Sequence, residues 1–128
     1  MTGERVLVVE DNDRNLKLVR AVLEHAGFDV SSAGTAEEAL DIAVERTPDL
    51  ILMDLQLPGM DGFAGLAALR TQPATLAVPV VALTALAMPH DRERVRMAGF
   101  DGYLEKPISV RDLPSQVHAA ITRGRRSS

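Results

Sequence analysis

LILMDLQLPGMDG, residues 50–62, joins a continuous apolar run to an acidic residue. Four apolar residues, Leu50 to Met53, run without interruption into Asp54. An unbroken apolar run is typical of a parallel strand that helices cover on both faces. A charged side chain at the end of such a strand costs free energy unless it is paired. The stretch therefore predicts a buried strand with an acid, Asp54, at its carboxyl end.

Outward from this strand, apolar runs alternate with segments of helical periodicity. The apolar runs are 6–9, 28–33, 50–53, 78–83 and 102–104. The helical segments are 15–25, 35–47, 62–70, 89–98 and 109–123. Thr35 and Glu38 form a capping-box pattern, and Ser109, with Asp112 three residues later, marks the last helix start. Five strands alternating with five helices predict an α/β domain with a parallel sheet.

Length and composition predict one domain over residues 1–128, with a core at about 5–121 and a flexible tail at 122–128. A formal net charge of -4 argues against binding to nucleic acid or an anionic membrane. The chain has no cysteine, which excludes disulfides and thiolate chemistry. No apolar stretch approaches the roughly 20 residues that span a bilayer, and no signal peptide pattern opens the chain. We therefore expect a cytoplasmic protein.

Polar side chains follow the predicted strands where each strand ends. They are Glu10, Asp11, Asp54, Thr84 and Lys106. The carboxyl ends of parallel strands share one edge of the sheet, and ligands bind outside that edge. If the first and third strands are neighbours, three carboxylates meet, and they need protons or a cation to coexist. Mg²⁺ suits such an oxygen cluster, because it accepts one or two carboxylates and keeps water for a phosphate to displace.

Each of these residues also has a simpler interpretation. An acid or a threonine at a strand end commonly caps the following helix, and most lysines are surface residues. These interpretations must hold independently at every position, whereas one site explains acid, hydroxyl and lysine together at one edge.

Four motifs resemble the receiver domain of two-component response regulators, of the single-domain type. They are VVEDN (8–12), LILMDLQLPGMDG (50–62), VVALTA (80–85) and GYLEKPIS (102–109). The resemblance implies a flavodoxin-like, doubly wound sheet of order 2-1-3-4-5 between two layers of helices. Residues 85–99 resemble the single-domain receivers of phosphorelays and cell-fate circuits.

The resemblance also implies a role for each polar residue at the strand ends. Asp54 looks like the phosphoacceptor, which takes a phosphoryl group from a phosphohistidine. Asp11 and Asp54 look like direct Mg²⁺ ligands, Glu10 a ligand through a water, and Gln56 a ligand through its backbone carbonyl. Glu10 departs from the commoner aspartate at its position, and its extra methylene still reaches a metal-bound water.

Four further positions match the family's switch. Lys106 resembles the lysine that pairs with a phosphoryl oxygen, and Thr84 the hydroxyl residue that turns toward the phosphate. Tyr103 matches the aromatic switch position, and Pro107 is expected to follow a cis peptide bond. The negative charge of the phosphoryl group is expected to move Thr84 and then Tyr103. The surface formed by residues 89–98, 102–104 and 109–123 is expected to change with them.

The expected function is thus that of a phosphorylation switch in a two-component system or phosphorelay, not a turnover enzyme. We expect the protein itself to catalyse both the transfer of the phosphoryl group onto its aspartate and the later hydrolysis of the aspartyl phosphate. The expected partners are a sensor histidine kinase or histidine phosphotransfer protein and a downstream protein. We expect no nucleic acid and no membrane, and either a monomer or a phosphorylation-dependent dimer.

Three other functions remain open at this level. A receiver scaffold that works without phosphorylation needs none of the acids, yet all are present. A phosphohydrolase of the haloacid dehalogenase type has an acid two residues after its nucleophile, where this chain has Gln56. A flavodoxin-type module cradles a phosphate in its first loop, where this chain has Glu10, Asp11 and Asp13.

Overall fold

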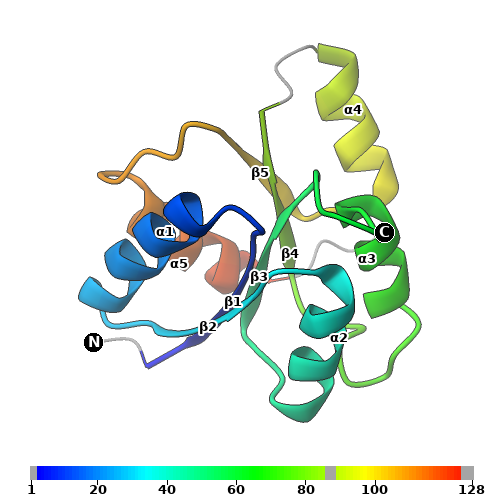
Figure 1. Ribbon diagram of the computed structural model, residues 1–128, viewed down its shortest axis with the longest axis horizontal. Helices are drawn as coiled ribbons and strands as arrows, with labels where there is room; N and C mark the ends of the chain where they lie inside the picture. The colour runs from blue at the N-terminus through cyan, green and yellow to red at the C-terminus, as the bar shows by residue number, and fades with distance from the viewer. Residues whose placement is uncertain (1–2, 86–88, 125–128) are drawn as a thin grey trace.

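A parallel five-stranded sheet with the strand order β2-β1-β3-β4-β5 forms the centre of the computed structural model, which describes residues 3–85 and 89–124 (Figure 1). The order and the parallel pairing confirm the predicted fold. The elements are β1 (Arg5–Val9), α1 (Asp13–His25), β2 (Asp29–Ala33), α2 (Ala36–Glu45), β3 (Leu50–Asp54), α3 (Gly62–Leu69), β4 (Val80–Thr84), α4 (Pro89–Ala98), β5 (Gly102–Glu105) and α5 (Leu113–Arg123).

Parts of two sequence predictions lie outside the described residues. They are residues 86–88 of the segment 85–99 and residues 125–128 of the predicted tail. Within the described part, α5 continues to Arg123. No described helix is both long enough and apolar enough to cross a bilayer.

Helices cover both faces of the sheet, with α1 and α5 on one side and α2 and α3 on the other (Figure 1). Because successive residues of a strand point to opposite faces, each central strand feeds two cores. On β3, Leu50 and Leu52 join the cluster of α1 and α5, and Ile51 and Met53 join the cluster of α2 and α3. All four are at most 1% exposed, which explains the unbroken apolar run.

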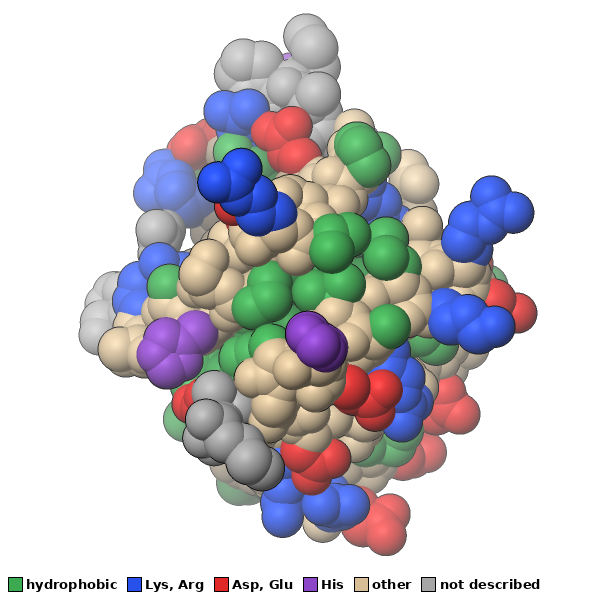
Figure 2. Space-filling model, turned by 90° about the vertical axis from the view of Figure 1, so that its left-hand side faces the viewer, with side chains coloured by type: hydrophobic (Ala, Val, Ile, Leu, Met, Phe, Trp, Pro, Cys, Tyr) green, Lys and Arg blue, Asp and Glu red, His purple; other side chains and the backbone are tan. Residues whose placement is uncertain are grey.

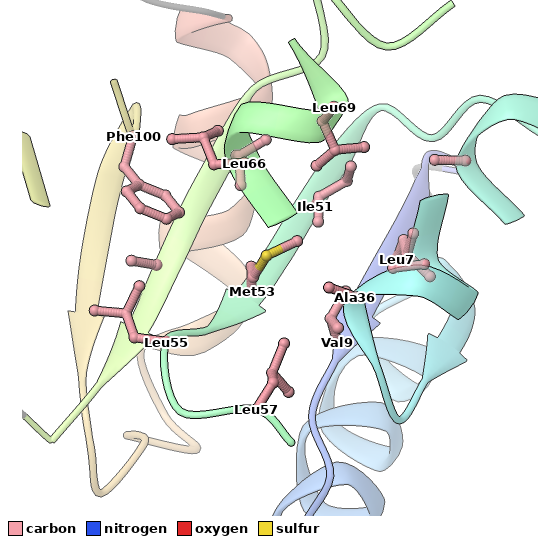
Figure 3. Packing of buried hydrophobic residues seen from close by; sticks show 14 of the residues in the cluster. Leu7, Val9, Ala36, Ile51, Met53, Leu55, Leu57, Leu66, Leu69 and Phe100 are labelled. Carbon is pink, nitrogen blue, oxygen red and sulfur yellow. The ribbon is translucent and has the colours of Figure 1, made fainter. Parts of the chain in front are cut away.

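The second of these cores packs α3 very closely against β3 (Figure 3). Met53 lies beneath α3, near Leu66, Leu69 and the Phe100 ring. A Cβ atom at Gly65 would lie 2.9 Å from Met53 Sδ and 3.1 Å from Ala36 Cβ, so any larger residue there would force the Met53 side chain or the helix to shift. α3 therefore packs directly against the carboxyl half of β3, which ends at Asp54.

Several element boundaries differ from the sequence prediction. α1 begins at Asp13 and not at Asn15, because Asn12 caps the helix, and α2 ends at Glu45 and not at residue 47.

The starts of β4 and α5 differ for reasons of backbone chemistry. β4 begins at Val80, not at Val78, because Val78 N donates to the Thr75 carbonyl in a turn and Pro79 has no N–H for the ladder. α5 begins at Leu113, not at Ser109. A helix from Ser109 would need an N–H at Pro114, which proline lacks, so Pro114 must lie in the first turn. Ser109 instead closes a preceding turn by accepting from Asp112 N at 3.2 Å.

The other helix starts follow the expected capping chemistry. The side chains of Asn12, Thr35 and Asp61 accept from the backbone N–H three residues later. Glu38 completes the predicted box one residue earlier than usual, because its carboxylate accepts from Gly34 N at 2.8 Å. Asn12 is therefore a helix cap, while its neighbours Glu10 and Asp11 remain available for another role.

A buried carboxylate, Asp101, ties the start of β4 to α3. It is 1% exposed and accepts from Val80 N at 2.8 Å and from Arg70 Nη2 at 3.1 Å. Arg70 Nη1 in turn donates to the backbone carbonyls of Thr75, Leu76 and Val78. One ion pair thus fastens the whole connection from α3 to β4.

The face that α1 and α5 form carries a group of apolar side chains (Figure 2). Among the apolar residues of these helices, Leu18 is 43% exposed, and Val22 and Ile121 are half-buried against the core. Both helices begin at the edge of the sheet where β1 and β5 end.

We predict that Asp101→Ala lowers the free energy of unfolding by about 3 kcal/mol, because it leaves the Arg70 charge and Val80 N without their buried acceptor. Urea denaturation measures this loss. Asp29→Ala is the matched control, since Asp29 pairs with Arg46 on an exposed surface, and it should change stability by less than about 0.5 kcal/mol. Equal effects of the two substitutions would contradict the central role of Asp101.

Candidate functional site

The polar residues predicted from the strand ends meet at the carboxyl edge of the sheet. Val9 pairs with Met53 in the β1–β3 register, so the next residues, Glu10 and Asp54, lie side by side. Thr84 ends β4 beside Glu105 of β5, and Lys106 follows directly. The strand order therefore brings together residues from four separate parts of the chain.

Three carboxylates form a cluster at this edge. Glu10, Asp11 and Asp54 each offer an oxygen, and these oxygens lie within 4.8 Å of one another. Glu10 is 2% and Asp54 3% exposed, while Asp11 is exposed to solvent. The predicted meeting of the three acids is confirmed, and the cluster is open on the Asp11 side.

Lys106 supplies the positive charge that the two buried acids share. Its Nζ lies 2.9 Å from Asp54 Oδ2 and 3.1 Å from Glu10 Oε2. Burial of the ammonium group favours its neutral form, but the contacts with Asp54 and Glu10 outweigh burial and raise the Lys106 pKa. The ammonium group is therefore held charged at neutral pH.

The two oxygens of Asp54 have different partners. Oδ1 accepts from the backbone N–H of Gln56 at 3.0 Å, and Oδ2 accepts from Lys106 Nζ. These contacts fix the plane of the carboxylate at the edge of the sheet. A carboxylate held in one orientation, beside a cation and near solvent, is suited to attack an electrophile that arrives from outside.

The negative charge of the buried Glu10 carboxylate is only partly compensated by its neighbours. Oε1 accepts from Asn12 N at 3.2 Å, whereas the buried Oε2 has the ion-pair contact with Lys106 but no hydrogen bond of proper geometry among the described residues. Burial, together with the negative charge of Asp54, raises the Glu10 pKa against the opposing effect of Lys106. Glu10 therefore retains capacity for one more electropositive partner.

The cluster fits a hard divalent cation. Carboxylate oxygens are the ligands that Mg²⁺ prefers, and the solvent side at Asp11 leaves room for its waters. The buried Glu10 Oε2 that lacks a hydrogen bond is the observation that supports this fit. Glu10, Asp11 and Asp54 could hold the ion, as could the backbone carbonyl of Gln56, which follows Asp54 by two residues.

Thr84 and Tyr103 lie on neighbouring strands behind this cluster. Thr84 is 3% exposed, and its carbonyl accepts from Lys106 N at 2.8 Å. Tyr103 is half-buried on the edge strand β5. The Lys106–Pro107 peptide bond is cis, as predicted.

Sequence reasoning missed two residues that shape the site. A Cβ atom at Gly62 would lie 2.5 Å from the Asp54 carbonyl oxygen and 2.8 Å from Leu55 Cα. Only a glycine therefore allows α3 to start against the loop that follows Asp54. The second is Arg92 on α4, which pairs with Glu105 at 2.7 Å and lies 5.6 Å from the centre of the Tyr103 ring. A glycine at the start of a helix and an arginine on a polar helix carry no local signal of such contacts.

Comparisons with known proteins agree on one family. Its model, the response regulator receiver domain, matches residues 6–118. The polar-differentiation response regulator DivK of Brucella ovis is 45% identical over 105 residues, which make up 82% of this chain and 85% of DivK.

Solved structures agree as well. A putative response regulator from Chloroflexus aurantiacus has a TM-score of 0.89 and 31% identity, over 95% of this chain and 100% of that one. The receiver domain of a sensor histidine kinase from Pseudomonas aeruginosa has a TM-score of 0.86 and 35% identity, over 94% and 99%. That second structure has a magnesium ion coordinated in its active-site cleft.

We predict that Glu10→Gln raises the stability of the metal-free protein at pH 7. Because the folded-state pKa of Glu10 is raised above its ordinary 4.5, its contribution to stability is full below that value and is lost as pH rises through the folded pKa. The amide removes this loss. Thermal unfolding in EDTA from pH 5 to 8 should show the wild type falling relative to the variant.

With added Mg²⁺, the wild type should instead become more stable than Glu10→Gln. A ligand at 100 times its Kd stabilises the folded state by about 2.7 kcal/mol, and Glu10→Gln should receive less of this. A variant that is less stable than the wild type in EDTA at pH 7 would show that the Lys106 contact outweighs the burial of the charge.

We predict that Gly62→Ala costs about 2 kcal/mol in unfolding free energy, because the new methyl group meets backbone atoms that cannot move aside cheaply. Urea denaturation measures it. Gly34→Ala is the control, since a Cβ there has no neighbour within 4 Å. If Gly62→Ala is as well tolerated as the control, the close contact is not a constraint.

Proposed function

This chain belongs to the response regulator receiver domain family, and on that premise we propose that it accepts a phosphoryl group from a phosphohistidine onto Asp54. The observation that carries the proposal is the position of the Asp54 carboxylate. One of its oxygens is held by Gln56 N, and the other lies 2.9 Å from Lys106 Nζ within a cluster of three acids.

In the proposed step an Asp54 carboxylate oxygen attacks the phosphorus atom. The bond between phosphorus and the donor's imidazole nitrogen breaks, the imidazole takes up a proton from solvent, and an aspartyl phosphate remains. Lys106, released in part from Asp54, pairs with an oxygen of the phosphoryl group. Phosphoryl transfer depends mainly on positioning and charge stabilisation, which these contacts supply.

Mg²⁺, when bound, supplies positive charge next to the phosphoryl oxygens. We propose that Asp11, Asp54 and the Gln56 carbonyl hold it directly and that Glu10 holds it through a water. The acidic cluster of this chain and the magnesium in the Pseudomonas aeruginosa relative support this assignment.

Phosphorylation would then act as a local change of charge. It adds about -1.5 to -2 at Asp54, which favours a hydroxyl donor such as Thr84 at the phosphate. Movement of Thr84 makes room for the Tyr103 ring on the neighbouring strand. The face of α4, β5 and α5 carries the signal, since Tyr103 lies on it.

The phosphoryl donor is a histidine kinase or a histidine phosphotransfer protein. α1 begins directly after the acidic cluster, and α5 follows the loop after Lys106. A donor that brings its imidazole to Asp54 would therefore lie over these helix starts. The partly exposed Leu18 and Val22 on α1 offer an apolar contact for it.

The remaining assignments follow from the same premise. The protein is a cytoplasmic switch without turnover of a substrate, either monomeric or dimeric on phosphorylation, and its output is a protein contact. The net charge of -4 supports the exclusion of nucleic acid and membrane. A scaffold without phosphorylation is the second candidate, and the haloacid dehalogenase type of phosphohydrolase is disfavoured by Gln56.

We predict that acetyl phosphate adds one phosphoryl group to the wild type only in the presence of Mg²⁺, as measured by intact mass. Asp54→Asn should gain none, because an amide is a poor nucleophile. Asp11→Asn should need at least tenfold more Mg²⁺, and Asp41→Asn, an exposed acid on α2, should behave as the wild type.

Hydroxylamine should remove the added mass, since it cleaves acyl phosphates. If Asp54→Asn still gains a phosphoryl group, a residue other than Asp54 is the phosphoacceptor. No gain in any variant, together with no thermal stabilisation by Mg²⁺, would favour the scaffold.

A further inference from the structure

Helix α3 is apolar on all its sides. Its sequence, GFAGLAAL, has no charged or polar side chain. A helix of this kind is normally buried all round. Its outward residues Ala64 and Ala67 are nevertheless exposed, and Ala68 is half-buried. In the described part of the molecule, α3 therefore keeps an apolar side open to solvent.

A hollow between α2 and α3 continues this apolar side. The two helices lie on the same side of the sheet (Figure 1), and the hollow between them has a volume of about 590 Å³. Its apolar lining consists of Leu40 and Val44 of α2 and Ala68 of α3. Val44 is 45% exposed and follows Leu40 by one helical turn, so the two form a stripe along α2. A continuous exposed apolar surface of this kind marks a site of interaction.

The charged residues that line the hollow are both acidic. Asp41 and Glu45 line it from α2, and the uncharged Thr71 and Gln72 complete the lining beyond the end of α3. Both acids are exposed, and neither has an ion-pair partner among the described residues. No described arginine or lysine lines the hollow. An apolar floor is thus combined with unpaired negative charge, which selects a basic partner by charge complementarity.

We propose that the hollow between α2 and α3 binds a basic amphipathic helix of a protein partner. The apolar side chains of that helix lie against Leu40, Val44 and Ala68, and its lysines or arginines lie against Asp41 and Glu45. The alanines of α3 favour a helix as the partner, since small side chains let a second helix approach closely.

The hollow is distant from the acidic cluster at the carboxyl edge of the sheet. α2 and α3 both begin at that edge, after β2 and β3, whereas the hollow involves the second half of α2 and the end of α3. A partner in the hollow therefore leaves the approach to Asp54 open. The inference does not rest on the proposed function, and it predicts equal binding with and without a phosphoryl group on Asp54.

The proposal is tested by selection from a display library of helical peptides with randomised outward positions, on the wild-type protein. We expect the selected peptides to carry an apolar stripe flanked by an excess of Lys and Arg. One selected peptide is then titrated into isotope-labelled protein, where the amide resonances of α2 and α3 should shift and those of α1 and α5 should not. A peptide of the same composition in scrambled order lacks the stripe and should bind about tenfold more weakly.

One pair of variants tests the role of charge. Asp41→Asn with Glu45→Gln should weaken the selected peptide about fivefold at low salt, and high salt should reduce this difference. Asp13→Asn with Glu24→Gln removes the same charge from α1, in the opposite layer of helices, and should leave binding unchanged.

A second pair of variants tests the apolar contact. Val44→Ser should weaken the selected peptide about fivefold, because it removes part of the apolar surface that the peptide buries. Val110→Ser is the matched control, since Val110 is 50% exposed and lies before α5, outside the hollow. Far-ultraviolet circular dichroism confirms that each variant is folded.

The proposal is overturned if the selection yields no peptide whose binding depends on Val44, if the selected peptides have no basic excess, or if the scrambled peptide binds equally well. Sedimentation that shows the wild type associating with itself, prevented by Val44→Ser, would assign the hollow to a second copy instead. Failure of the proposed function is distinct, since it appears as absent phosphorylation of Asp54 whether or not the peptide binds.

Discussion

The sharing of one ammonium group by two buried carboxylates is the interaction on which the rest of the site depends. Glu10 and Asp54 lie side by side because β1 and β3 are neighbours, and two such charges do not coexist near a core without compensation. Lys106 supplies part of that compensation from the end of β5, across the width of β4. The compensation is incomplete, since Glu10 Oε2 lacks a hydrogen bond and burial keeps the Glu10 pKa raised, and in the proposed function a metal ion would supply the rest.

The sheet explains why these charges meet at one edge and nowhere else. Alternate residues of β1, β3 and β4 fill two apolar cores, so the strands offer polar groups only where they end. Close approach of α3, permitted by Gly62 and Gly65, leaves the carboxyl end of β3 little freedom. The rigid centre thus contrasts with the β5 edge, where Tyr103 is bordered by hollows and α4 is held in part by arginines. A switch that moves Tyr103 would repack this edge and leave the centre in place.

Most of the fold could be read from the chain. Periodicity located all ten elements, and the acids at the strand ends pointed to the cluster that Glu10, Asp11 and Asp54 form. The errors arose where local pattern and backbone chemistry disagree. Ser109 and Asp112 look like a helix start, yet Pro114 delays the helix to Leu113. Arg92, Arg70 and Gly62 were not identified, because no local pattern reveals what they contact: Glu105 for Arg92, Asp101 for Arg70 and the Asp54 backbone for Gly62.

The class of fold, the identity of the polar groups and the edge at which they gather follow from the chain alone, since strand and helix periods and residue chemistry are local properties. Which of those groups touch depends on how the strands and helices pack. Lys106 reaches Asp54 and Glu10, Glu10 keeps an oxygen without a hydrogen bond, and Arg92 covers Tyr103. The physical reason is that pairing between charges depends on separations of a few ångströms, and strand order and helix packing set those separations between residues far apart in sequence.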